Sequence, residues 1–63
     1  MDERLMQAKR SRVIRLYYAA QQGKIKVSEA RLEIEKQCAG ITNKEVLDCK
    51  QEALKRLRDL DNG

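Results

Sequence analysis

The stretch GITNKEV, residues 40–46, separates two helix-forming segments and predicts how the second of them begins. Thr42 and Glu45 have the S/T-x-x-E spacing of a capping box, in which each side chain accepts a hydrogen bond from the other residue's backbone N–H. Ile41 and Val46 stand on either side of this box as a hydrophobic staple. We therefore expect a helix to begin here and to run over about residues 43–60.

Two glycines divide the rest of the chain, which contains no proline. Gly23 and Gly40 suit the left-handed position just past the end of a helix. They predict a long helix over about residues 2–22 and a short one over about residues 28–39, with Ser28 as its N-cap. The expected fold class is all-α, a single small domain over residues 1–63 with long, short and long helices.

Apolar residues recur at helical spacing in each segment and predict the core. The expected core positions are Leu5, Met6, Val13, Leu16, Tyr17, Ala20, Val27, Ala30, Ile34, Cys38, Ile41, Val46, Leu47, Cys49, Ala53, Leu54, Leu57 and Leu60. Ile14, Tyr18 and Leu32 lie off these stripes. Scattered exposed apolar residues are ordinary, but a cluster of them would mark a dimer or partner surface.

The chain is short of large side chains, since it has no Trp or Phe. A domain of this size buries only about 60% of the surface of its unfolded chain, so we expect it to self-associate as a homodimer. The charged start of the chain and the lack of a long apolar run predict a cytoplasmic protein that does not enter a membrane. Cys38 and Cys49 are then expected to be reduced apolar residues, with a disulfide or redox pair as the alternative.

Catalysis is difficult to build from this composition. The chain has no histidine, so it lacks the usual general base near neutral pH and a common zinc ligand. Ser11 has no evident base beside it, and Asp48 and Glu52 share a helical face that we interpret as solvated surface. We expect a non-enzymatic protein with no cofactor and no metal site.

The net charge of +4 is unevenly placed. Through residue 26, seven basic residues stand against two acidic ones, whereas from residue 27 onward seven basic residues meet eight acidic ones. The excess concentrates in the segment KRSRVIR, residues 9–15. Such a helix fits an acidic protein partner or nucleic-acid phosphates. The spread of its arginines around the helix also fits a face that is merely solvated.

The leading hypothesis is a small helical regulator or adaptor that binds a protein, as a homodimer, and acts by occlusion or bridging. The expected partner-binding residues are Arg10, Arg12, Ile14, Arg15 and Tyr18. Tyrosine and arginine are enriched among the residues that contribute most to protein interfaces.

The alternative hypothesis is a regulator that binds nucleic acid. Residues 28–60 resemble a helix-turn-helix, with Gly40 in the turn. Lys36 stands where that motif uses a small residue, and three glutamates of the same helix would bring negative charge towards the DNA backbone. The expected contacts in this alternative are Lys9, Arg12, Asn43, Lys44 and Lys50.

Overall fold

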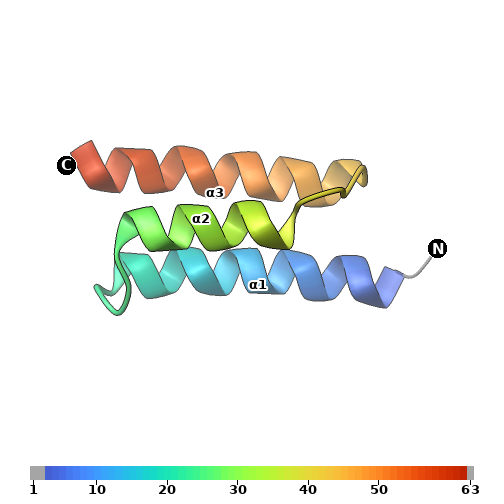
Figure 1. Ribbon diagram of the computed structural model, residues 1–63, viewed down its shortest axis with the longest axis horizontal. Coiled ribbons are helices and arrows are strands. Elements are labelled where there is room, and N and C mark those ends of the chain that lie inside the picture. The colour runs from blue at the N-terminus through green and yellow to red at the C-terminus, as the bar shows by residue number, and fades with distance from the viewer. Residues whose placement is uncertain (1–2, 63) are drawn as a thin grey trace.

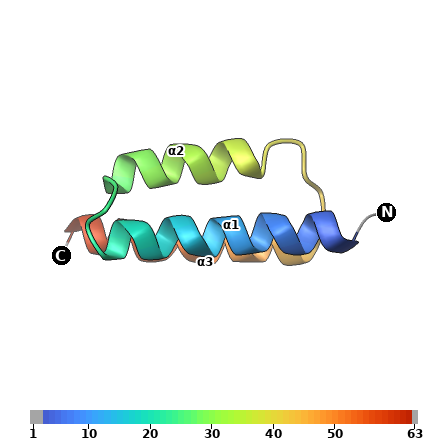
Figure 2. The ribbon, with the colours of Figure 1, turned by 90° about the horizontal axis from the view of Figure 1, so that it is seen from below.

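The computed structural model describes residues 3–62 and contains, over that range, the helices α1 (Glu3–Gln21), α2 (Val27–Gln37) and α3 (Lys44–Asn62). The helices lie side by side along the 38 Å long axis, and α2 runs opposite to α1 and α3 (Figure 1). Figure 2 places α2 to one side of the layer formed by α1 and α3, so the bundle has a triangular cross-section. The predicted all-α fold with long, short and long helices is confirmed, although Asp2, the predicted first helical residue, lies outside the described range.

The first helix ends in a hydrogen-bonded turn around Gly23. The backbone N–H of Lys24 donates to the carbonyl of Ala19 at 2.9 Å, and that of Gly23 donates to the carbonyl of Ala20 at 3.1 Å. This pair of bonds is the Schellman motif. Gly23 has a φ of 78°, a left-handed conformation that a residue with a Cβ adopts only with strain. The prediction that Gly23 ends the first helix is therefore confirmed.

The second helix begins one residue earlier than the sequence predicts. Lys26 occupies its N-cap position without a side-chain cap, so the prediction that Ser28 caps this helix is wrong. Ile25 and Val27 both pack against the core, and this packing favours a helix that already includes Val27. At the other end, Gly40 has a φ of 76° in the turn that follows α2.

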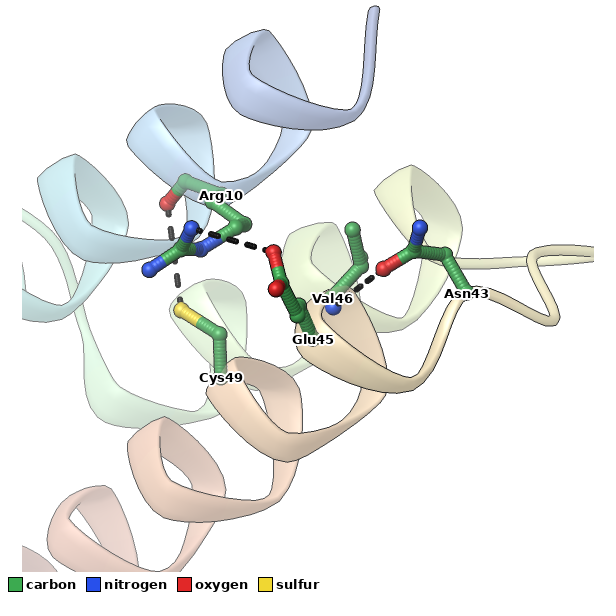
Figure 3. A network of polar contacts seen from close by, with 5 residues as sticks. All are labelled: Arg10, Asn43, Glu45, Val46 and Cys49. Atoms are coloured by element: carbon green, nitrogen blue, oxygen red, sulfur yellow. Dashed lines mark hydrogen bonds and ion pairs between the residues drawn. The ribbon is translucent and has the colours of Figure 1, made fainter. Parts of the chain in front are cut away.

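The third helix is capped by Asn43, and the predicted capping box of Thr42 and Glu45 is wrong by one residue. The backbone N–H of Val46 donates to Asn43 Oδ1 at 3.1 Å (Figure 3). Asparagine is at least as good an N-cap as threonine. The Glu45 carboxylate pairs with Arg10 on α1 (Figure 3). With Asn43 as the N-cap, the residue pair of a hydrophobic staple moves along by one position, so the predicted staple is also out of register.

The core is small and contains no large ring. Its buried members are Val13, Ala20, Ala30, Ile34, Cys38, Val46, Ala53 and Leu57. Leu5 and Leu60 were predicted to join them but are exposed. Both lie towards ends of α1 and α3 that project beyond the shorter α2 in Figure 1, so the third side of the bundle is missing around them. No helix in the described part of the chain has the length and apolarity needed to cross a membrane.

Candidate functional site

A groove of about 670 Å³ lies between α1 and α3, and no residue of α2 lines it. We call it the α1–α3 groove. Its lining residues are Arg10, Ile14, Tyr17, Tyr18, Glu45, Asp48, Cys49, Glu52, Ala53 and Arg56. Because α2 covers the opposite side of the α1–α3 layer in Figure 2, the groove opens on the uncovered face of the bundle.

The apolar part of the groove is built around Ile14 and Tyr18, which are one helical turn apart on α1. The two residues are 42% and 52% exposed, respectively. The rings of Tyr17 and Tyr18 are 5.3 Å apart between centroids and tilted by 54°. Tyr17 packs against the core, so its ring supports that of Tyr18 from one side. Ile14 and Tyr18 therefore do form a cluster, whereas Leu32 lies apart from them on α2.

One end of the groove is closed by contacts between α1 and the first turns of α3. Arg10 Nη1 lies 3.6 Å from Glu45 Oε2, and the Cys49 thiol donates a long hydrogen bond of 3.9 Å to the carbonyl oxygen of Arg10 (Figure 3). Exposed ion pairs of this kind contribute little to stability, about 0–1 kcal/mol. These contacts show the register of the two helices: residue 10 on α1 lies level with residues 45–49 on α3.

A second ion pair lies further along the charged edge of the groove. We call this edge the rim; it consists of Arg10, Glu45, Asp48, Glu52 and Arg56. Arg56 Nε donates to Glu52 Oε1 at 3.1 Å across one turn of α3. This hydrogen bond is the main reason that the pKa of Arg56 is raised, and the neighbouring Tyr17 hydroxyl adds to the effect. Asp48, the third carboxylate of the rim, forms no ion pair or hydrogen bond with the described residues. The rim thus carries three carboxylates against two guanidinium groups.

The structure separates the predicted partner-binding residues into two groups. Arg10, Ile14 and Tyr18 line the α1–α3 groove. Arg12 turns towards α2 instead, where its Nη1 donates to Gln37 Oε1 at 3.3 Å. Arg15 is exposed and, within residues 3–62, has neither an ion pair nor a hydrogen bond.

The residues predicted for nucleic-acid contact are spread over several parts of the bundle. Lys9 shares the Gln37 side-chain oxygen with Arg12, at 3.2 Å. Lys50 forms an ion pair with Glu35 at 3.9 Å, Asn43 serves as the cap of α3, and Lys44 is exposed at its first turn.

The helices of the proposed helix-turn-helix are also arranged differently from that motif. In Figure 1, α2 and α3 run antiparallel beside each other. In a DNA-binding helix-turn-helix the two helices cross at about 90–120°, which leaves the second one free to enter the major groove. Residues 28–60 therefore form two sides of a bundle, because their apolar faces both pack on α1.

The two cysteines are free thiols in different surroundings. Cys38 is buried in the core, and this burial raises the pKa of its thiol. Cys49 is partly exposed beside the groove. Among the described residues, no three His, Cys, Asp or Glu side chains gather closely enough to hold a metal ion.

Sequence reasoning placed Asp48 and Glu52 on one helical face but interpreted that face as solvated surface, so it missed that α3 forms one wall of the groove. Glu45, Glu52 and Arg56 recur at spacings of seven and four, a signal for one shared helical face. That signal does not say which helix the face lies beside.

Comparisons with models of protein families, with curated proteins and with solved structures find no match for this chain.

Proposed function

We propose that this protein is a non-enzymatic helical regulator or adaptor, and that it binds a protein partner through the α1–α3 groove. The observation that carries the proposal is the exposed pair Ile14 and Tyr18, which is held beside a rim of charged side chains. An apolar centre within a polar rim is the usual composition of a protein interface. Tyrosine and arginine, which both line this groove, are also enriched among interface residues that contribute most binding energy.

The charges of the groove favour protein over nucleic acid. Glu45, Asp48 and Glu52 line one side, where they would repel phosphate groups. Lys9 and Arg12, two of the basic residues expected to contact nucleic acid, lie at the boundary with α2 and share a hydrogen-bond acceptor there.

A bound protein would act by covering or joining surfaces. A helix or a flat apolar surface would place its side chains against Ile14 and Tyr18, with polar groups meeting the rim. By binding a partner in the groove, the protein would cover the contact surface of that partner and so occlude it from other proteins. A molecule that carries two such grooves would bridge two partners. We also propose a reducing compartment such as the cytoplasm as the place of action, because Cys38 and Cys49 are both free thiols.

Photo-crosslinking from defined positions tests the proposal. A benzophenone amino acid replaces Tyr18 in one variant and Leu32, on α2, in a matched control, and both are irradiated in living cells. We expect position 18 to give a covalent adduct of discrete mass with a protein, and position 32 to give none. An Ile14→Asp change in the first variant should abolish the adduct.

Two results would contradict the proposal. One is equal crosslinking from both positions. The other is no adduct from position 18, together with binding of a labelled duplex that weakens steeply with salt, which would favour the nucleic-acid alternative.

A further inference from the structure

The residues that line the α1–α3 groove recur every three or four positions on both helices. On α1 they are residues 10, 14, 17 and 18, and on α3 they are residues 45, 48, 49, 52, 53 and 56. Such spacing forms one continuous stripe along each helix. At a rise of about 1.5 Å per residue, the stretch from residue 45 to residue 56 is about 16 Å long, which is about three turns of an α-helix.

The opposite side of the same α1–α3 layer already holds a helix of this length. The helix α2 has 11 residues and packs against both α1 and α3. Its fully buried residues, Ala30 and Ile34, lie one turn apart. Figure 2 shows α2 on one side of the layer only. A further helix of similar length on the groove side would complete a four-helix arrangement.

The backbone of the groove walls favours a helix over an extended segment. Most of the groove lies beyond the first turn of α1 and of α3, where backbone N–H and C=O groups bond within each helix. An extended segment would therefore leave its own backbone groups without partners over Ile14 and Tyr18, which is unfavourable. A helix satisfies its backbone internally and presents a stripe of side chains three and four residues apart.

The charges of the groove specify what else the bound helix carries. Glu45 and Glu52 are matched by Arg10 at 3.6 Å and by Arg56 at 3.1 Å. Asp48, which stands between the two glutamates, has neither an ion pair nor a hydrogen bond within residues 3–62. A helix in the groove would displace water from this carboxylate. Because an unpaired charge that loses water is unfavourable, a complementary helix brings a cation to it.

The register of the groove places this cation relative to the apolar residues. The contacts of Arg10 set Asp48 about level with residue 10, one helical turn before Ile14. Tyr18 lies one turn beyond Ile14. Asp48, Ile14 and Tyr18 thus follow one another along the groove at intervals of about one turn. A helix that matches them has one basic residue and then two apolar residues at the same intervals along one face.

From this match of length, backbone and charge, we infer that the occupant of the α1–α3 groove is an amphipathic helix of about three turns from a partner protein. Its apolar residues cover Ile14 and Tyr18, and an arginine or lysine one turn away pairs with Asp48. The inference rests on the proposed function, since it names the chemistry of the partner of the same groove.

Selection from a peptide library tests which helices the groove accepts. Peptides of about 15 residues on an alanine-rich helical host, long enough to form a helix in solution, are displayed on phage with one face randomised. Those that bind the immobilised protein should share two apolar residues three or four positions apart and an arginine or lysine one turn to one side. Ile14→Asp should abolish their binding. Selected peptides without the basic residue would overturn the inference, as would a library from which Ile14→Asp removes no binder.

Exchange of charges keeps the inference testable even if Ile14→Asp fails to fold. Fluorescence anisotropy measures the dissociation constant of a selected peptide. Asp48→Arg in the protein, or glutamate in place of the basic residue in the peptide, should each raise this constant at least about fivefold, because like charges then meet. The two changes together should restore it to within about twofold. Asp61→Arg is the matched control, because Asp61 lines a hollow beside the first turn of α2 and not the groove. An Asp48→Arg protein that binds as tightly as the control would contradict the pairing.

The photo-crosslinking experiment separates failure of this inference from failure of the proposed function. Mass spectrometry of the adduct from position 18 identifies the attached segment of the partner. A basic amphipathic helix is the expected result. An adduct with a second copy of this chain, or with an extended or acidic segment of another protein, overturns the inference and leaves the groove as a partner site. The absence of any adduct contradicts both.

Discussion

Asn43 Oδ1 lies 3.1 Å from the backbone nitrogen of Val46 and accepts its hydrogen bond. The Val46 side chain is fully buried, so the bond that starts α3 also holds a core residue in place. Directly beside the cap, Glu45 reaches Arg10 on α1. One short segment therefore sets the start of α3, its attachment to the core and the closed end of the α1–α3 groove.

Removal of this cap should destabilise the protein. We expect Asn43→Ala to lower the free energy of unfolding by about 1 kcal/mol, because the N–H of Val46 loses its acceptor. Thr42→Ala is the matched control and should change it by less than about 0.5 kcal/mol, since surface substitutions away from such contacts have small effects. Urea denaturation followed by circular dichroism measures both. A larger loss for Thr42→Ala would mean that the threonine is the true cap.

The sequence was sufficient to predict the fold because glycines mark where α1 and α2 end, and few other residues tolerate the left-handed conformation found there. Gly23 adopts the left-handed conformation that its position requires, and the apolar stripe of Ala30, Ile34 and Cys38 is buried as its spacing predicts. The cap of α3 was predicted one residue too early, because Thr42 and Asn43 are adjacent and both are good N-caps.

The candidate site was predictable only on its α1 side. Ile14 and Tyr18 are four residues apart on one helix, so their proximity follows from local geometry. The opposite wall depends on how α3 packs against α1, which no local pattern specifies. The direction of Arg12 was likewise set by Gln37, a residue distant in sequence that provides an acceptor on α2.

The core is small enough that the loss of any one of its large, fully buried side chains should cost much of its stability. Leu57 is fully buried, whereas Leu60, one turn later, is 40% exposed. Leu57→Ala should cost about 2–5 kcal/mol, a large part of the stability of so small a domain, because it removes packing and leaves a cavity. Leu60→Ala in the unmodified background should cost less than about 1 kcal/mol. Thermal unfolding of the two variants gives the comparison, and similar losses would place both residues in the same environment.

Gly23 offers a measurement of backbone strain alone. A Cβ built at this residue meets no atom within 4 Å, so a substitution there causes no steric clash with other residues. Gly23→Ala should still cost about 1–2 kcal/mol because of its left-handed φ. Gly23→Asn should cost less, since asparagine tolerates this conformation better. An alanine variant as stable as the unmodified chain would show that α1 ends in another conformation.

The buried thiol predicts a dependence of stability on pH. Burial raises the pKa of Cys38 above its ordinary value of 9.0, so the folded state holds this proton more tightly than the unfolded state. The resulting stabilisation is present below pH 9.0 and is lost as pH rises through the folded-state pKa. We therefore expect the free energy of unfolding to fall between pH 9.0 and the folded-state pKa of Cys38, and to fall less steeply in Cys38→Ala. Identical slopes would exclude Cys38 as the source.

The central claim is that the α1–α3 groove is a protein interface built around Ile14 and Tyr18. Photo-crosslinking from position 18 in living cells tests it most directly, because an adduct forms only with a protein that lies against the groove. The account predicts an adduct of discrete mass from position 18 and none from position 32 on α2. Equal crosslinking from both positions, or an adduct from position 18 that survives Ile14→Asp, would contradict it.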